Sequence, residues 1–215
     1  MAQTSTKNGI NTNKIIEKQQ LNPQVKLLKI HALTIAQKAQ PGQFIILKAH
    51  ANSERIPLRL ANWDKVEGTI TIIFQEVGYS TIELGKLEVG EKIQNLAGPL
   101  GKPSEIQNYG KVAVVCGGVG TAVAYPVAKA LKEAKNCIVT IMGARNKDLF
   151  ILMPEMITVS DEMYFSTDDG SKGQKGFVID VLKALINERY EFDLVFAVGP
   201  PMMITLLLKL RVHSA

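Results

Sequence analysis

The segment Lys111–Leu131, KVAVVCGGVGTAVAYPVAKAL, decides the fold of the second half of the chain. Its β-branched start predicts a buried strand, three glycines follow at Gly117, Gly118 and Gly120, and the alanine-rich remainder predicts a helix. A strand, a glycine turn and a helix in this order place backbone N–H groups and a helix N-terminus against a phosphate. The segment therefore predicts a nucleotide site at the edge of a parallel sheet.

The glycine pattern is not a complete dinucleotide fingerprint. The full fingerprint has an acidic residue about 20 residues after the glycines, at the end of the next strand. Here that strand, Ile138–Met142, ends in Gly143, Ala144 and Arg145. The missing acid argues against a standard dehydrogenase and for a variant nucleotide lobe. The alternative is a tight turn that binds no ligand.

The composition excludes several classes of function. The chain has 215 residues, which fits one large or two small domains, and a net charge of +5 without a block of Lys and Arg. We expect a mild bias toward anionic cofactors, no nucleic acid as a partner, and no membrane span, because no apolar run reaches about 18 residues.

The cysteines and histidines predict no metal site. Cys116 and Cys137 form no CxxC pair, and two cysteines cannot supply the four ligands of an iron–sulfur cluster. Cys116 lies where the strand enters the glycine turn, and we expect a small buried residue there rather than a redox group. Residues 1–13 lack a signal sequence and predict a disordered tail, so the expected location is cytoplasmic.

The first half of the chain carries signals of short strands and turns. Glycine and proline punctuate extended runs rich in β-branched residues, which predicts a small antiparallel barrel. The expected strands cover 14–18, 25–30, 44–48, 55–61, 69–75 and 91–96, with one short helix over 81–86. The segment Gly98–Pro103, GPLGKP, breaks any regular element and is expected to mark the domain boundary.

After this boundary strands alternate with helices, which predicts a parallel sheet covered by helices. The expected strands cover 111–116, 137–142, 162–167 and 194–198, the helices cover 122–134, 149–156 and 178–188, and a last apolar stretch covers 202–210. The predicted organisation is a tail over 1–13, a barrel over 14–103 and a nucleotide-binding lobe over 110–215.

A barrel followed by a lobe with the GGVG turn resembles the ferredoxin–NADP reductase superfamily. Further motifs resemble the FAD- and NAD(P)-binding subunit of sulfide dehydrogenase/ferredoxin–NADP reductase, which is related to the electron-transfer subunit of dihydroorotate dehydrogenase. These motifs are QPGQF at 40–44, RIPL at 55–58, FQEVG at 74–78, GPLG at 98–101, GAR at 143–145, TDDG at 167–170 and GP at 199–200. The resemblance covers roughly 14–210 and implies an antiparallel FAD-binding β-barrel followed by a Rossmann-like NAD(P)-binding lobe.

The resemblance implies which barrel residues hold FAD. These are Arg55, Ile56, Pro57, Leu58, Gly78, Ser80 and Thr81. The RIPL strand would pass the isoalloxazine ring, with Arg55 paired to a flavin phosphate. The turn at 78–81 would form the pyrophosphate site, since small side chains and N–H donors at a helix start suit an anion. The residues by themselves also fit an ordinary capped helix and an isolated surface arginine.

The resemblance likewise implies the NAD(P) residues of the lobe. These are Gly117, Gly118, Gly120, Thr121, Arg145, Asp168, Asp169, Gly199 and Pro200. The glycines would cradle the nucleotide, and Arg145 would meet the adenosine ribose or a 2′-phosphate, which leaves NADH and NADPH both open. The segment 168–170 also fits a plain Asp-Gly turn.

Two departures from the family pattern stand out. Relatives carry Thr or Ser after the RIPL run, where a hydroxyl can approach flavin N5, and this chain has Arg59. A guanidinium there either stabilises an anionic reduced flavin or blocks the ring by its bulk. Relatives also continue past Gly199-Pro200 with another strand and the cysteines of a [2Fe–2S] centre. We therefore expect an incomplete lobe that lacks this centre and leaves a sheet edge unpaired. The alternatives are a partner that covers this edge, a fragment of a longer protein, or a decaying copy.

These features predict a FAD-dependent NAD(P)H oxidoreductase subunit that passes electrons to a partner redox subunit or a ferredoxin-type acceptor. The cofactors carry the chemistry, so no general acid, nucleophile or metal ligand is expected. The first alternative is a dihydroorotate dehydrogenase electron-transfer subunit. The second is a truncated nucleotide-binding subunit without catalytic activity.

Overall fold

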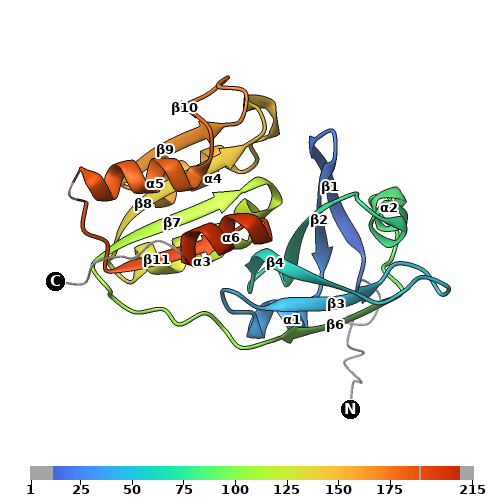
Figure 1. The fold of residues 1–215 in the computed structure, drawn as a ribbon. Helices are drawn as coiled ribbons and strands as arrows, with labels where there is room; N and C mark the ends of the chain where they lie inside the picture. Colours follow the sequence, from blue (N-terminus) through green and yellow to red (C-terminus); the bar gives the residue numbers. More distant parts are fainter. Residues whose placement is uncertain (1–11, 189, 209–215) are drawn as a thin grey trace, which may run out of the picture. The chain divides into compact units, whose positions relative to one another are not determined.

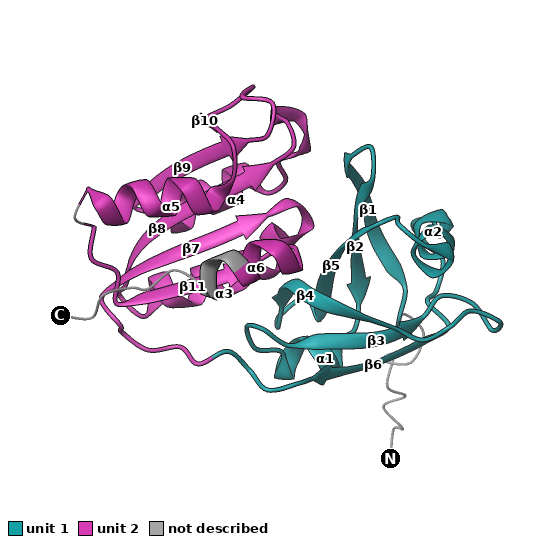
Figure 2. Ribbon diagram, in the orientation of Figure 1, with its two compact units in different colours: residues 1–104 teal, residues 105–215 magenta. Residues whose placement is uncertain are grey.

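The protein folds as two compact units, residues 1–104 and 105–215 (Figure 2). The structure is a computed structural model and describes residues 12–188 and 190–208. Of the predicted tail, residues 1–11 lie outside the described residues, whereas the Asn13 N–H donates to the carbonyl of His31. No helix among the described residues is long and apolar enough to cross a membrane.

Unit 1 is an antiparallel sheet of six strands in the order β1-β2-β5-β4-β3-β6 (Figure 1; β5 is labelled in Figure 2). The strands are β1 (Ile15–Asn22), β2 (Val25–His31), β3 (Phe44–Lys48), β4 (Ile56–Asp64), β5 (Thr69–Gln75) and β6 (Asn95–Leu100), with helices α1 (Leu33–Lys38) and α2 (Tyr79–Lys86). A bridge between Lys14 and Lys92 joins the two ends of the strand order. This bridge brings the two ends of the strand order close together, and with the six-stranded antiparallel sheet it confirms the predicted barrel.

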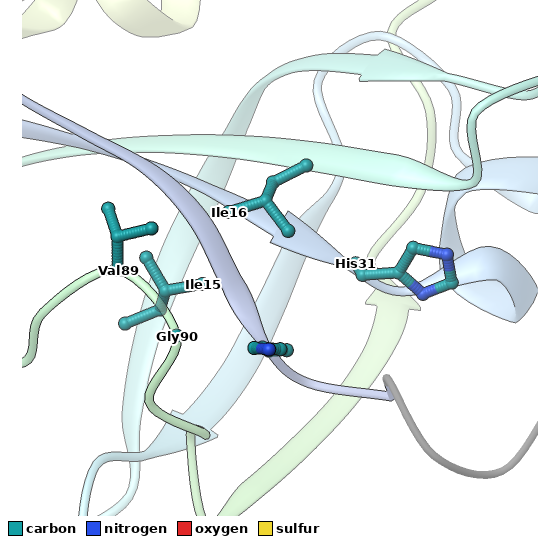
Figure 3. Close-up of a pocket in the computed structure, with 6 residues that line it drawn as sticks. Ile15, Ile16, His31, Val89 and Gly90 are labelled. Carbon is teal, nitrogen blue, oxygen red and sulfur yellow. The ribbon is translucent and has the colours of Figure 1, made fainter.

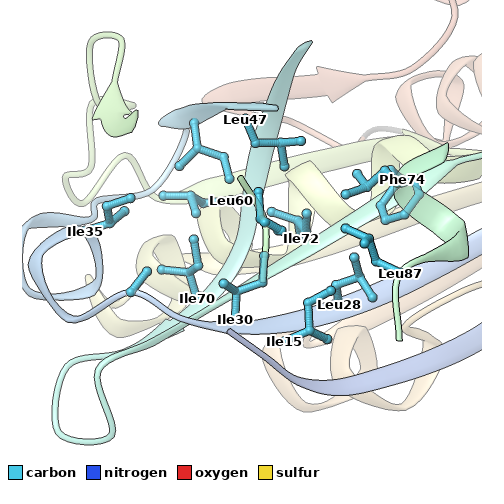
Figure 4. Packing of buried hydrophobic residues seen from close by; sticks show 14 of the residues in the cluster. Ile15, Leu28, Ile30, Ile35, Leu47, Leu60, Ile70, Ile72, Phe74 and Leu87 are labelled. Atoms are coloured by element: carbon cyan, nitrogen blue, oxygen red, sulfur yellow. The ribbon is translucent and has the colours of Figure 1, made fainter. Parts of the chain in front are cut away.

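Strand alternation builds the core of unit 1. Leu28 and Ile30 on β2 and Ile70 and Ile72 on β5 are fully buried, and Figure 4 shows their side chains gathered with Phe74. Successive strand residues point to opposite faces, so every second residue enters the barrel. The other face of each strand is left for solvent or for ligands.

The structure differs from the sequence prediction at the end of the barrel. The segment 98–103 was expected to break any element, but β6 runs through Gly98 and the cis-linked Pro99 to Leu100. Within the sheet β6 pairs with β3, on one side only. Proline lacks an N–H group and is tolerated on such an edge strand. The strand prediction over 91–96 was therefore four residues too early, and α1 was not predicted.

Unit 2 is a parallel sheet of five strands in the order β10-β9-β8-β7-β11. The strands are β7 (Lys111–Gly117), β8 (Cys137–Ala144), β9 (Glu162–Thr167), β10 (Gln174–Lys175) and β11 (Leu194–Val198). The helices are α3 (Thr121–Glu133), α4 (Met153–Val159), α5 (Val178–Asn187) and α6 (Pro201–Leu208), with 3-10 turns at 118–120 and 147–149.

Helices cover both faces of this sheet. Val112 and Val114 of β7 pack with α3 and α4 on one face, while Ala113 and Val115 pack with α5 on the other. Both faces of β7 are thus apolar, which explains its continuous hydrophobic run. The alternation of strands and helices confirms the predicted parallel lobe. The prediction missed the short β10 and began α4 four residues too early, and residues 209–210 of the last apolar stretch lie outside the described residues.

Candidate functional site

The first candidate site is the N-terminal turn of α2, which follows the loop after β5. The hydroxyl Oγ1 of Thr81 accepts hydrogen bonds from the N–H groups of Val77 and Gly78, both at 3.1 Å, and donates to the Gly78 carbonyl at 2.9 Å. This cap fixes the turn. The first N–H groups of a helix have no carbonyl partner inside the helix and carry a partial positive charge, so the turn favours an anion.

Gly78 leaves the backbone of this turn open to approach. A side chain at this position would meet no atom within 4 Å. The backbone of Gly78 is extended, a conformation that any residue adopts. The fold itself therefore does not require glycine at 78. An unfilled space beside the first turn of a helix is the shape that a diphosphate needs.

Strand β4 begins beside the same turn. The hydroxyl of Ser80 donates to Oε2 of Glu54 at 3.4 Å, and Arg55 is the next residue and is exposed. Along β4, Pro57 is also exposed, while Ile56 and Leu58 pack partly against the barrel core. The structure thus brings Arg55, Pro57, Gly78, Ser80 and Thr81 to one region. Ile56 and Leu58 lie on the core side of the strand, and their predicted contact with FAD remains a prediction.

Another hollow of unit 1 does not involve these residues. It has a volume of about 260 Å³ and is lined by Lys14, Ile15, Ile16, His31, Val89 and Gly90, as Figure 3 shows for the labelled residues. None of the predicted FAD residues lines it. The candidate site of unit 1 therefore rests on the α2 turn and the outer face of β4.

The second candidate site is the glycine turn between β7 and α3. Gly118 is exposed, has a φ of +55°, and a side chain there would meet no atom within 4 Å. Its left-handed backbone favours glycine, and the space above it is open. Gly117 precedes it at the end of β7. The turn is therefore open to solvent at Gly118, and its predicted contact with a phosphate remains a prediction.

Gly120 and Thr121 play a different part in this turn. A side chain at Gly120 would lie 2.6 Å from the carbonyl oxygen of Val198, so glycine here permits close packing on the end of β11. Thr121 is buried, and its hydroxyl donates to Sγ of Cys116 at 3.7 Å. Both residues shape the turn from inside. Their predicted contact with a nucleotide remains a prediction.

The end of β11 completes the wall of this site. A side chain on Gly199 would lie 3.7 Å from the backbone N of Gly117 but only 2.5 Å from Cε of Met203, and one on Gly117 would lie 3.8 Å from Cδ of Pro200. The carboxyl ends of β7 and β11 therefore lie side by side. Met203 was not predicted, because a methionine in an apolar helix gives no signal of its own.

The loops after β8 and β9 are bound to each other. The N–H groups of Asp168 and Asp169 donate to the carbonyls of Ala144 (3.2 Å) and Arg145 (3.3 Å), and the Lys147 N–H donates to Oγ of Ser171 at 2.8 Å. The side chains of Arg145 and Asp168 are exposed. The structure thus brings together Arg145, which the resemblance assigned to the adenosine end of a nucleotide, and the loop of Asp168 and Asp169, which it assigned to NAD(P) without placing them at either end.

Asp169 stabilises this pair of loops. Its Oδ1 accepts hydrogen bonds from the hydroxyl of Ser171 at 2.7 Å and from the Ser171 N–H at 2.9 Å. These two bonds lower the pKa of the Asp169 carboxyl below its ordinary value. Asp169 therefore forms an Asx turn, which is the local role that the Asp-Gly interpretation predicted.

Cys116 is buried, as predicted, below the glycine turn. Burial raises the pKa of its thiol to about 12, although the hydrogen bond from Thr121 opposes this shift. A thiol that stays protonated is a poor nucleophile. Within residues 12–188 and 190–208, no group of three His, Cys, Asp or Glu side chains is arranged to hold a metal ion.

The comparisons with known proteins agree with this architecture. A dihydroorotate dehydrogenase B electron transfer subunit homolog of Thermotoga maritima is 45% identical over 195 residues, which are 91% of this chain and 68% of the relative. The dihydroorotate dehydrogenase B electron transfer subunit of Bacillus caldolyticus is 33% identical over 84% of this chain and 70% of its own length. The chain thus spans about two thirds of these relatives. No protein-family model matches it.

Solved structures share the fold. A chain of the NADH-dependent reduced ferredoxin–NADP oxidoreductase, studied for flavin-based electron bifurcation, is 42% identical with a TM-score of 0.87 and covers 93% of this chain and 72% of its own. The ferredoxin reductase of carbazole 1,9a-dioxygenase is 20% identical, has a TM-score of 0.76, covers 91% of this chain and 64% of its own, and shows the fold alone.

An antiparallel barrel and a parallel lobe, each with an open turn, define the ferredoxin–NADP reductase class of proteins. Within this class, the sequence identity to the two relatives from Thermotoga maritima and Bacillus caldolyticus, and the share of their length that this chain covers, identify the family. The chain belongs to the family of dihydroorotate dehydrogenase B electron transfer subunits and their homologues.

Proposed function

We propose that this chain is a flavoprotein oxidoreductase subunit that passes electrons between NAD(P)H and a partner redox protein through FAD. The observation that carries the proposal is the pair of open glycine turns, at Gly78 in unit 1 and at Gly118 in unit 2. Each unit offers one exposed backbone turn at a helix start, and each turn suits one dinucleotide diphosphate. The names of the relatives as electron transfer subunits support this assignment.

The residues of unit 1 fit FAD. The N-terminal turn of α2 and the guanidinium of Arg55 would bind the diphosphate, and Pro57 would offer an apolar surface to the ring. The flavin supplies the exchange between a hydride and single electrons. The protein holds the ring against β4, and the Thr81 cap keeps the phosphate turn in shape without help from the ligand.

The residues of unit 2 fit a nicotinamide nucleotide. Four of the predicted residues lie at the carboxyl ends of β7 and β11, where open parallel sheets bind ligands: Gly117, Gly118, Gly199 and Pro200. Arg145 and Asp168 would meet the adenosine end. An arginine in place of an acid leaves NADH and NADPH both open as the donor.

The partner in this proposal is a second redox subunit or a ferredoxin-type acceptor. Dihydroorotate dehydrogenase is one candidate, because relatives at 33% identity bear the name of its electron transfer subunit. Both cysteines are free thiols, which suits a reducing compartment such as the cytoplasm.

The test is the visible absorption spectrum of the purified chain with added FAD, recorded without oxygen before and after NADH or NADPH. We expect flavin bands that remain after gel filtration and that bleach with one of the two nucleotides. A chain that stays colourless would overturn the proposal and favour a nucleotide-binding subunit without catalytic activity. Bound flavin that neither nucleotide reduces would overturn the assignment of unit 2.

A further inference from the structure

Arg59 is held in place on the outer face of β4. Its Nη1 donates a hydrogen bond to the carbonyl of Gly42, and its guanidinium carbon lies 5.8 Å from the centre of the Phe44 ring. Phe44 and Arg59 are direct partners in the pairing of β3 with β4. A guanidinium has five N–H donors, so one hydrogen bond leaves most of them for other partners.

The two anchors of Arg59 are themselves fixed by the barrel. A side chain on Gly101 would lie 2.8 Å from Cε1 of Phe44, which shows that the ring packs directly on the β6 end of the sheet. Nε2 of Gln43, the residue between the two anchors, donates to the Gly101 carbonyl at 2.9 Å. The charge therefore has a defined position that needs no ligand to create it.

Arg59 lies on the same face of β4 as the candidate FAD residues. Arg55, Pro57 and Arg59 are exposed, and the residues between them pack toward the core. Four residues of a strand span about 13 Å. The Arg55 end adjoins the phosphate turn through the bond of Ser80 to Glu54. In the proposed function, FAD with its diphosphate at that end and its ring against β4 would bring the ring toward Arg59.

The anchors of Arg59 also show how it leaves room for the ring. Both anchors belong to β3 and the turn before it, so the guanidinium is drawn toward β3 and does not lie along β4 over Pro57. Of the two alternatives that the sequence left open for this position, the anchored geometry favours a fixed charge beside the ring over an obstruction.

We propose that Arg59 raises the reduction potential of the bound flavin by stabilising its anionic reduced form. The inference rests on the proposed function. Two electrons and one proton convert FAD to FADH⁻, whose negative charge lies on the pyrimidine part of the ring. The proton comes from solvent or arrives with the nicotinamide hydride, and Arg59 takes no part in the proton transfer. A fixed positive charge favours the anion over neutral oxidised FAD.

The experiment compares the chain with Arg59→Gln and Arg59→Lys variants, each loaded with FAD. The readouts are the dissociation constant of oxidised FAD and the two-electron potential against a reference dye. We expect Arg59→Gln to weaken binding of reduced FAD at least tenfold relative to oxidised FAD, which lowers the potential by about 30 mV or more. Arg59→Lys keeps the charge and should restore most of the potential.

A matched control removes a charge elsewhere on the same barrel. Lys65 is exposed in the turn after β4, six residues and about 20 Å along the strand from Arg59. We expect Lys65→Gln to leave the potential unchanged. An equal potential in Arg59→Gln and the unaltered chain would overturn the inference and leave Arg59 a structural anchor. Tighter FAD binding in both redox states of Arg59→Gln would overturn it in favour of obstruction. Failure of the unaltered chain to bind FAD would overturn the proposed function itself.

Discussion

Lys26 and Glu76 form an ion pair with 2.8 Å between Nζ and Oε1, and only 17% and 19% of their side chains are exposed. The same Nζ donates to the carbonyl of Gly85 at 3.0 Å. Glu76 lies in the loop before α2 and Gly85 lies in its last turn. Lys26 on β2 therefore contacts both the loop before α2 and the last turn of α2. These two contacts fix the position of α2, and with it the open turn at Gly78, on the barrel.

Lys26→Met should destabilise unit 1, because it leaves the carboxylate of Glu76 without its partner in a largely buried place. We expect the free energy of unfolding to fall by about 1–3 kcal/mol. Urea denaturation followed by the fluorescence of Trp63, the single tryptophan, measures it. The matched control is Lys86→Met, whose pair with Glu83 has a lysine 65% exposed, so water screens this pair and its loss should cost less stability than the loss of the Lys26 pair. Equal losses in the two variants would show that burial does not distinguish these pairs.

Gly78→Val should separate binding from folding at the α2 turn. The backbone at Gly78 is extended and a side chain meets no atom within 4 Å, so stability should change by less than about 0.5 kcal/mol. The valine would occupy the space proposed for a diphosphate, and we expect FAD affinity to fall at least about tenfold, or roughly 1.4 kcal/mol. Equilibrium dialysis with FAD measures the affinity. Unchanged affinity would remove the α2 turn from the flavin site.

Asp161 should make the stability of unit 2 sensitive to acid. Its carboxylate accepts hydrogen bonds from Nζ of Lys132 on α3 and from the Ile138 N–H, which lower the pKa of this carboxyl below its ordinary 3.8. A lowered pKa in the folded state means that the unfolded chain takes up the proton first as pH falls. The stabilisation is thus complete above about pH 4 and is lost as the pH falls through the lower folded value.

Asp161→Asn tests whether the stability of unit 2 falls with pH because of this carboxylate. The variant should have a lower melting temperature than the unaltered chain at pH 7, and the difference should shrink as the pH falls below about 4. Thermal unfolding followed by circular dichroism from pH 7 to pH 3 gives both curves. A difference that stays constant with pH would contradict the assignment of the effect to ionised Asp161.

The sequence allowed the lobe to be predicted better than the end of the barrel. Val112, Val114 and Val115 are buried on a central strand, so their continuous apolar run has one structural solution. The pair Gly98-Pro99 fits two structures, because it can end an element in a loop and it is also tolerated on an edge strand. The pairing of this segment with β3 decides between the loop and the edge strand, and a single sequence does not show which strands pair.

The candidate sites show the same limit. The openness of Gly118 follows from a local turn and could be predicted from GGVG. The packing of Gly120 on the carbonyl of Val198 joins positions far apart in the chain, and local sequence carries no sign of it. Arg59 was visible as a departure from the family pattern. Its bond to the Gly42 carbonyl, which decides its direction, depends on the pairing of β3 with β4.

Gly118→Asn should abolish nicotinamide nucleotide binding while unit 2 stays folded. Asparagine tolerates a left-handed backbone better than other side chains, so the φ of +55° should cost no more than about 1 kcal/mol. Its side chain would stand in the open space above the turn, where the proposal places the diphosphate. The measurement is the affinity for NADH and NADPH by titration calorimetry. A matched control is Gly90→Asn, at another left-handed glycine whose added carbon would meet only the Lys14 side chain, at 3.9 Å, in unit 1. The control should bind nucleotide normally. If Gly118→Asn also binds normally, the nucleotide does not approach this turn, and unit 2 must be assigned a different site.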